Sequence, residues 1–445
     1  MSHFKITGGV PLKGSVRIGG AKNASFKLMI ASLLAQSESR LLNFSQISDV
    51  HLVGKIIQYL GGTVRKAGER ALFIDPSTLS NYFIDPAHGE QGRFSTMFLP
   101  ALLHRFGEAR VPAPGGDKIG KRPLDRHFEG LTALGVQINY QDGLFIAKTQ
   151  GMHGAKYRFN KNTHTGTETL IMAATLAKGK TILENAALEP EIDDLISFIN
   201  KMGGRITRKP GRVIEIEGVK TLHGAIHKLL PDRNEAVSYA CAALATKGDL
   251  IIENAVPKHL RAFLKALDKA GGSYEVGDYG IRFFYTKPLQ AVQLTTAIEP
   301  GFMTDWQPLW ATLMTQATGT STIHETIMAS RFQYMEELIK MGARIESFQP
   351  KVNNPELRYN FNLQDDLPNA QHAIRIFGPV TLKAGEFRVK DLRHGATIVL
   401  AAMTAKGVST IHNIAQIERG YEDLEQRLQS MGAQISLVSD LSSDN

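Results

Sequence analysis

The stretch Thr169–Ala177 (TLIMAATLA), followed by Thr181–Asn185 (TILEN) and, after an amphipathic run, by Gly203-Gly204, decides the fold. The first stretch is small or apolar at nearly every position, which is typical of a helix buried on all sides. The second is β-branched and apolar and reads as a strand. The run between them and the glycines keeps helical spacing, with Ile192, Leu195, Ile196, Ile199 and Met202 on one face.

The same order of segments recurs along the chain, beginning with Ala24–Ala35 and Arg40–Phe44. Glycines that end the amphipathic helices mark six copies, at Gly61, Gly135, Gly203, Gly271, Gly342 and Gly432. Their spacing of about 70 residues is too long for a solenoid and suits a β-α-β-α-β-β unit. The last gap is about 90 residues because a polar, proline-containing segment at 347–371 is inserted, and we expect it on the surface.

The repeats predict an α/β fold of two similar domains, each an inside-out α/β barrel of three β-α-β-α-β-β units. The apolar helices lie inside, and the sheets and one-sided helices surround them. We expect residues 22–231 to form the first domain and residues 1–21 plus 232–445 the second. Lead-in strands are expected at residues 12–14, 152–154, 222–224 and 382–384.

Composition narrows the class of protein. The 445 residues are 43% hydrophobic and 21% charged, as in globular proteins, and no apolar run reaches the roughly 20 residues of a membrane helix. The first ten residues lack the features of a secretion signal. A single cysteine, Cys241, excludes an intrachain disulfide and fits a reducing cytoplasm. The net charge of +8 suits anionic ligands.

The loop Pro114–His127 concentrates the residues that could bind such a ligand. Three glycines and two prolines exclude a helix interior, while two lysines, two arginines and two aspartates supply charge. Glycine lets the backbone approach a ligand closely, and the guanidinium of Arg122 can grip a phosphate. A solvated basic loop is the alternative interpretation.

Cations also stand where the buried helices begin, at Lys22, Arg93, Arg233 and Arg393. A cation at a helix N-terminus is unfavourable by a few tenths of a kcal/mol, so four such positions out of six suggest that these ends bind anions. Asp305 stands at a fifth helix start. It is a candidate general base, with an ordinary helix cap as the alternative.

Several motifs together resemble those of the enolpyruvyl transferases, and among them the branch that acts on UDP-N-acetylglucosamine. The resemblance covers the chain except the insertion and about the last ten residues. The matching segments are Gly19–Ala24, Pro114–Gly116, Ile119-Gly120, Arg122-Pro123, Glu184–Ala187, Glu189–Ile192, Pro231–Arg233, Pro300–Phe302, Thr304-Asp305, Asp391–Arg393 and Glu418–Glu422.

The resemblance implies transfer of the enolpyruvyl group of phosphoenolpyruvate to the 3-hydroxyl of UDP-N-acetylglucosamine, with release of phosphate. This is the first committed step of peptidoglycan synthesis, so the expected setting is cell wall biogenesis, cell shape, and the cell cycle and division. The reaction needs no metal or organic cofactor. We expect a cytoplasmic monomer with no nucleic acid or membrane partner.

The resemblance also implies which residues act. The catalytic residues would be Lys22, Asp117 and Asp305, with Asp305 taking the proton from the sugar hydroxyl. Phosphoenolpyruvate would be held by Lys22, Arg122, Arg393 and Arg419. The remaining substrate-binding residues would be Asn23, Arg93, Pro123, Leu124, Asp125, Arg126, Lys161, Asn162, Thr163, His164 and Ile327, together with Arg122 and Asp305.

Three departures from the family pattern keep other interpretations open. Asp117 replaces the usual loop cysteine, the residue that fosfomycin alkylates in the family, while Ala329-Ser330 and His394 replace other usual residues. Alternatives are enolpyruvyl transfer to shikimate 3-phosphate or another nucleotide, and a non-catalytic paralogue. RNA 3′-phosphate cyclases share a related architecture. However, basic residues at helix starts, rather than a stripe interleaved with aromatic residues, favour small anions.

Overall fold

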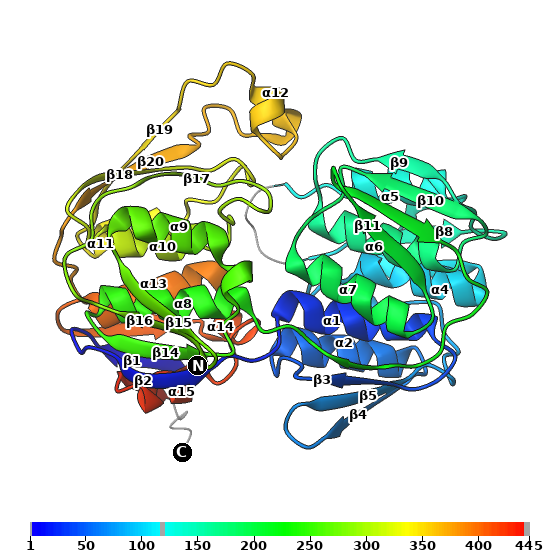
Figure 1. Ribbon diagram of the computed structural model, residues 1–445, viewed down its shortest axis with the longest axis horizontal. Helices are drawn as coiled ribbons and strands as arrows, with labels where there is room; N and C mark the ends of the chain where they lie inside the picture. The colour runs from blue at the N-terminus through cyan, green and yellow to red at the C-terminus, as the bar shows by residue number, and fades with distance from the viewer. Residues whose placement is uncertain (1, 116–120, 440–445) are drawn as a thin grey trace. The chain divides into compact units, whose positions relative to one another are not determined.

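The computed structural model describes residues 2–115 and 121–439, which form two compact units (Figure 1). Of the described residues, the first unit comprises 19–115 and 122–230, and the second comprises 2–18, 121 and 231–439. The expected first domain, residues 22–231, differs from the first unit at residues 19–21, 121 and 231. Residues 19–21 join the first unit, where the Ala21 amide donates a hydrogen bond to the Leu230 carbonyl at 2.8 Å.

Each unit is built on buried helices that are apolar on nearly all sides, as predicted. In the second unit α8 (Arg233–Ala245), α10 (Gln307–Met314) and α13 (Leu392–Thr404) pack against one another. Every residue of α8 except Ser238 is buried. The corresponding helices of the first unit are α1 (Lys22–Ala31), α4 (Leu99–Phe106) and α6 (His164–Thr175), with α4 packed on α6.

The one-sided helices end as the glycine pattern predicted. They are α2 (Ser48–Tyr59), α5 (Asp125–Ala133), α7 (Pro190–Lys201), α9 (Arg261–Ala270), α11 (Met335–Lys340) and α15 (Leu424–Ser430). The glycine after each helix has a positive φ, from 72° at Gly271 to 102° at Gly203. A left-handed residue closes the last helical turn, and only glycine adopts that conformation without strain. Short helical turns are η1 (Ser32–Leu34), α3 (Pro86–Gly89), η2 (Ser95–Phe98), η3 (Pro257–His259) and α14 (Ala415–Glu418).

Six small sheets surround the buried helices. Those of the first unit have the orders β13-β3-β5-β4, β6-β8-β7 and β9-β10-β12-β11. The strand bounds are β3 (Ser39–Leu42), β4 (Thr63–Ala67), β5 (Ala71–Asp75), β6 (Glu108–Pro112), β7 (Gln137–Gln141), β8 (Leu144–Lys148), β9 (Lys156–Arg158), β10 (Lys180–Glu184), β11 (Arg205–Lys209), β12 (Val213–Glu217) and β13 (Ile226–Lys228). Buried helices pack on the sheet of their own repeat, as α6 does on β10 and β12 and α4 does on β6 and β8. Helices inside and sheets outside confirm the inside-out α/β barrel.

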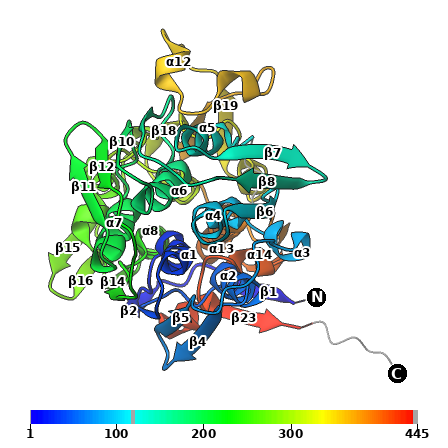
Figure 2. The same cartoon turned by 90° about the vertical axis from the view of Figure 1, so that its right-hand side faces the viewer.

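The second unit repeats this plan with the orders β2-β14-β16-β15, β17-β18-β20-β19 and β21-β22-β1-β23. The bounds are β1 (His3–Thr7), β2 (Lys13–Arg17), β14 (Asp249–Glu253), β15 (Ser273–Gly277), β16 (Gly280–Phe284), β17 (Gln293–Thr295), β18 (Gly319–His324), β19 (Arg344–Phe348), β20 (Ala373–Gly378), β21 (Glu386–Arg388), β22 (Val408–His412) and β23 (Gln434–Val438). Because β1 lies between β22 and β23, the first and last strands of the chain share one sheet (Figure 2).

The lead-in strands are parallel to the strand that follows the buried helix, as β9 is to β10 and β2 is to β14. Three of them begin later than predicted, at Lys156, Ile226 and Glu386. His153 and Lys383, within the predicted segments, each form only a single parallel bridge. Glycine before the strand weakens local β propensity and delays regular pairing.

The insertion between β19 and β20 extends away from its sheet and carries α12 (Pro355–Arg358) and a turn, η4 (Leu363–Asp365) (Figure 1). Most of its residues are exposed or half-buried, as expected of a surface segment. Two aromatic side chains anchor it. Tyr359 and Phe361 are buried and pack on each other and on His372, with ring centroids 5.0–5.2 Å apart.

None of the helices in the described part of the chain combines the length and apolar character that crossing a bilayer requires.

Candidate active site

Lys22 and Asn23 form the first turn of α1, so Lys22 stands at the start of a buried helix. The α1 N-terminus has no side-chain cap, and the Lys22 ammonium lies 2.6 Å from Asp49 Oδ2 on α2. Both side chains are buried. The Asp49 carboxylate therefore offsets the unfavourable placement of a cation at a helix start.

Three arginines of the first unit, Arg93, Arg122 and Arg126, form another group of candidate site residues. The Arg93 guanidinium donates a hydrogen bond of 2.8 Å to the Arg122 carbonyl. Arg126, in the first turn of α5, donates from Nε to Asn160 Oδ1 at 3.1 Å. That oxygen also accepts the Lys161 amide at 2.6 Å. The expected loop residues 122–126, with Pro123, Leu124 and Asp125 between the arginines, are thereby brought to Arg93 and Lys161.

Positive charge is concentrated at this group. Burial and the neighbouring Arg122 lower the pKa of Arg93 to about 9. Burial, followed by Arg93 and Arg126, lowers the pKa of His127 to about 3 against the opposing effect of Asp125. Such shifts arise where cations crowd a poorly solvated region. The group would therefore gain from binding an anion.

The turn 161–164 is held by its own hydrogen bonds. Asn162 Nδ2 donates to the Asn185 carbonyl at 3.0 Å, and Thr163 caps α6 by accepting the Gly166 amide at 3.2 Å. Asn162 and Thr163 therefore fix the backbone from which His164, the first residue of α6, projects.

Lys27 and Glu168 form a buried ion pair behind His164 that the sequence analysis missed. Their charged atoms lie 2.6 Å apart, their side chains are 2% and 0% exposed, and they join α1 to α6. His164 Nε2 is 3.3 Å from Lys27 Nζ and 3.2 Å from Glu168 Oε1. Burial lowers the pKa of His164. The carboxylate of Glu168 favours the protonated ring more strongly, so the pKa of His164 is raised overall. The sequence could have indicated these two residues, because Lys27 and Glu168 are opposite charges within two otherwise apolar helices.

Replacing Lys27 with alanine is expected to destabilise the protein by about 3–5 kcal/mol, because Glu168 is left buried without its counterion. The double variant Lys27→Leu/Glu168→Leu should recover most of this loss, since two apolar side chains avoid the desolvation cost. Urea unfolding followed by circular dichroism measures both. Equal destabilisation by the single and double variants would show that packing, and not charge pairing, holds this position.

Asp305 is the centre of the candidate site in the second unit. Its Oδ1 accepts a hydrogen bond of 2.7 Å from Arg331, and its Oδ2 lies 3.7 Å from the Arg393 guanidinium. The N-cap of the following helix, α10, is Trp306, and no side chain caps it. Asp305 is thus not the helix cap that the sequence left open. The carboxylate is held between two guanidinium groups, and a carboxylate so positioned is a candidate general base.

Arg393 is positioned from two sides. Asp391 caps α13 by accepting the Arg393 and His394 amides at 2.9 and 3.0 Å. The Arg393 guanidinium donates to the Tyr421 hydroxyl at 3.1 Å. Arg419 lies two residues before this tyrosine, at the end of α14. Tyr421 lies in the matching segment Glu418–Glu422, and Arg331 follows the departure Ala329-Ser330, but neither was predicted as a site residue.

A buried carboxylate places Ile327 with respect to Asp305. Glu325 accepts hydrogen bonds from the Ile327 amide at 2.8 Å, from the Thr304 hydroxyl at 2.9 Å and from the Thr296 hydroxyl at 3.0 Å. The turn that carries Ile327 is therefore tied to the residue before Asp305. Glu325 was also missed by the sequence analysis.

The remaining predictions have different outcomes. Arg233 pairs with Glu299 at 2.7 Å and lies over the Trp306 ring, so the structure gives this helix-start cation a protein partner. Asp117 lies outside the described residues. Within residues 2–115 and 121–439, His, Cys, Asp and Glu side chains form no group of three or more that could hold a metal ion.

Comparisons with known proteins agree with this architecture. Residues 6–428 match the family model described as EPSP synthase (3-phosphoshikimate 1-carboxyvinyltransferase). The UDP-N-acetylglucosamine 1-carboxyvinyltransferase of Chlamydia muridarum is 40% identical over 98% of both chains. That of Protochlamydia amoebophila is 37% identical over 99% of this chain and 95% of its own. The enolpyruvyl transferase NikO of Streptomyces tendae has the same fold, with a TM-score of 0.84 at 24% identity over 98% of this chain and 99% of its own. The chain therefore belongs to the EPSP synthase (3-phosphoshikimate 1-carboxyvinyltransferase) family of enolpyruvyl transferases.

Proposed function

We propose that this protein transfers the enolpyruvyl group of phosphoenolpyruvate to the 3-hydroxyl of UDP-N-acetylglucosamine and releases phosphate. The observation that carries the proposal is the similarity to UDP-N-acetylglucosamine 1-carboxyvinyltransferases over 98–99% of the chain. Mass spectrometry of the nucleotide product, with NMR to locate the new ether at the 3-oxygen, tests it. Attachment at another oxygen, or to no nucleotide, would overturn it.

The acceptor is bound through basic, polar and apolar side chains. Arg93, Arg122, Arg126 and Lys161 suit the diphosphate, because guanidinium groups offer paired donors to phosphate oxygens. Further contacts come from Asn23, Pro123, Leu124, Asp125, Asn162, Thr163, His164, Ile327 and Asp305. The lowered pKa values of Arg93 and His127 support an anionic ligand at this group.

The chemistry is an addition followed by an elimination. Asp305 removes the proton from the 3-hydroxyl, whose oxygen attacks C2 of phosphoenolpyruvate while C3 gains a proton. The resulting tetrahedral intermediate loses a proton from C3 and expels phosphate. Arg331 and Arg393 contact the two oxygens of the Asp305 carboxylate and fix its direction. Asp117 exchanges the proton at C3.

Phosphoenolpyruvate is bound by Lys22, Arg122, Arg393 and Arg419. Lys22→Ala and Arg419→Ala are each expected to raise the dissociation constant for phosphoenolpyruvate about 10- to 100-fold, since each removes a charged hydrogen bond of about 1.5–3 kcal/mol. Isothermal titration in the presence of UDP-N-acetylglucosamine measures this.

The control for these variants is Lys228→Ala, which removes an exposed lysine on β13 and should leave the affinity unchanged. Lys22→Gln, which keeps a donor for Asp49, separates loss of ligand binding from local unfolding. An unchanged dissociation constant in a folded Lys22→Ala or Arg419→Ala variant would contradict the assigned role.

In the cell, the reaction supplies the first committed step of peptidoglycan synthesis and so supports cell wall biogenesis, cell shape, and the cell cycle and division. The single, buried Cys241 fits a cytoplasmic location. We expect a monomer whose two compact units are the two domains predicted from the repeats. Sedimentation at several protein concentrations checks the oligomeric state.

A further inference from the structure

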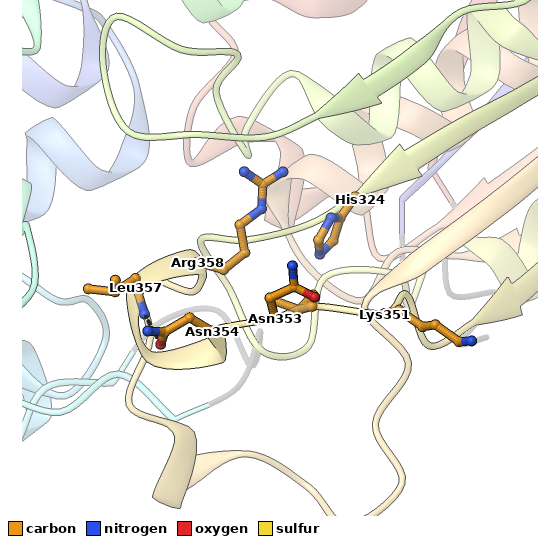
Figure 3. A pocket seen from close by; sticks show the side chains of 7 residues that line it. His324, Lys351, Asn353, Asn354, Leu357 and Arg358 are labelled. Atoms are coloured by element: carbon orange, nitrogen blue, oxygen red, sulfur yellow. Dashed lines mark hydrogen bonds between the residues drawn. The ribbon is translucent and has the colours of Figure 1, made fainter.

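The insertion between β19 and β20 borders a pocket that the proposed reaction does not use. Its volume is about 400 Å³, and it is lined by Lys351, Val352, Asn353, Asn354, Leu357 and Arg358 of the insertion and by His324 at the end of β18 (Figure 3). All seven residues belong to the second unit. Five of the seven lining residues are exposed, and only Val352 and His324 are half-buried, so the pocket is open to solvent.

The lining is polar and basic. Its basic side chains are those of Lys351, Arg358 and His324, and none of the seven lining side chains is acidic. The Arg358 guanidinium donates one hydrogen bond, of 3.3 Å, to the Thr295 hydroxyl. Neither Lys351 nor Arg358 forms an ion pair with any residue that the structure describes. Figure 3 shows Arg358 and His324 near each other, with Asn353 beside them and Lys351 pointing away.

The His324 side chain is half-buried, whereas Arg358 is exposed. The His324 Nε2 lies 3.2 Å from the Tyr359 hydroxyl, and the two rings meet edge to face. Burial, then Arg358 and His372, lower the pKa of His324 to about 4. Asp366, the nearby acid, is bound to His372 at 2.7 Å. Positive charge is therefore concentrated around the imidazole without an acid in the pocket wall.

We propose that this pocket binds the phosphate group of a small molecule. The Arg358 guanidinium supplies charge-assisted donors, and the Asn353 amide adds a neutral donor to the phosphate oxygens. The His324 ring is neutral near pH 6 without a ligand, and a bound phosphate favours its protonation. Asn354 fixes this end of α12, because its Oδ1 accepts the Leu357 amide at 3.3 Å. The exposed Leu357 side chain lies beside the organic part of the ligand.

The pocket is connected to the acceptor-binding turn. The Asn360 amide, two residues after Arg358, donates to the Thr326 carbonyl at 2.8 Å, and Thr326 precedes Ile327. Arg358 itself binds Thr295, whose neighbour Thr296 binds Glu325. Hydrogen bonds therefore join the pocket wall to the turn that carries Ile327.

The test follows the His324 ring by NMR in protein with labelled histidines, with His324→Gln used to assign the signal. Inorganic phosphate and ADP are titrated separately at pH 6 and constant ionic strength. We expect a saturable shift of the His324 signal and a higher His324 pKa with ligand bound. Arg358→Gln should weaken binding at least tenfold, whereas Arg388→Gln, which changes an exposed arginine on β21, should not.

Two further arms complete the experiment. ADP binding at least tenfold tighter than phosphate identifies an organic phosphate as the ligand, and equal affinities identify free phosphate. Asn353→Leu replaces Arg358→Gln if the latter fails to fold. The site is overturned if neither probe shifts the His324 signal saturably, or if the variants bind as well as the parent. Turnover is not needed for this readout, so an inactive protein would refute the proposed function alone.

Discussion

Replacement of Asp305 by asparagine is expected to lower turnover by a factor of about 10²–10⁴, the usual contribution of a general base, while UDP-N-acetylglucosamine binding changes little. The asparagine carbonyl can still accept the hydrogen bond from Arg331, so the local structure is preserved. It cannot accept the proton of the 3-hydroxyl. Steady-state phosphate release and nucleotide titration measure the two effects.

Asp278→Asn is the matched control, because it changes an exposed aspartate of the same unit in a turn between β15 and β16. Asp305→Ala should be less stable than Asp305→Asn, since it leaves the buried Arg331 without its partner. Near-normal turnover of Asp305→Asn with unchanged thermal stability would exclude Asp305 as the base.

Asp117→Cys is expected to convert the protein from one that fosfomycin does not modify into one that it modifies fully. A thiolate is a strong nucleophile toward an epoxide carbon, whereas a carboxylate is a poor one. Asp117 can nevertheless exchange a proton with the substrate, so the parent protein should be active and resistant. Intact-protein mass spectrometry after incubation with UDP-N-acetylglucosamine and fosfomycin measures the adduct.

Asp117→Ser is the control for this experiment, because its hydroxyl is not a comparable nucleophile at neutral pH. An adduct on the parent protein, or none on an active Asp117→Cys variant, would show that residue 117 is not placed where the family's loop cysteine acts.

The sequence was sufficient to predict the repeat architecture because local rules govern it. Gly271 and Gly203 close helices in a left-handed conformation that other residues avoid, and this constraint is readable at a single position. The helices of the TLIMAATLA type are buried on all sides because they carry no polar face. The helix-closing glycines and the lack of a polar face can both be recognised within a short stretch of sequence.

The pairings of the site could not be predicted in the same way, because they join residues distant in the chain. Lys27 meets Glu168 across 141 positions, and Arg331 meets Asp305 across 26. Glu325 looks like an ordinary charged residue after a strand, yet it is buried and accepts four hydrogen bonds. Such partners follow from tertiary packing, which periodicity and spacing do not specify.

Phosphate release from phosphoenolpyruvate, measured with each of several acceptors, tests the central claim most directly. The acceptors are UDP-N-acetylglucosamine, shikimate 3-phosphate and a nucleotide sugar that lacks a free 3-hydroxyl. The account predicts release that depends on UDP-N-acetylglucosamine and is absent with the other two. Release with shikimate 3-phosphate alone, or with no acceptor at all, would contradict it.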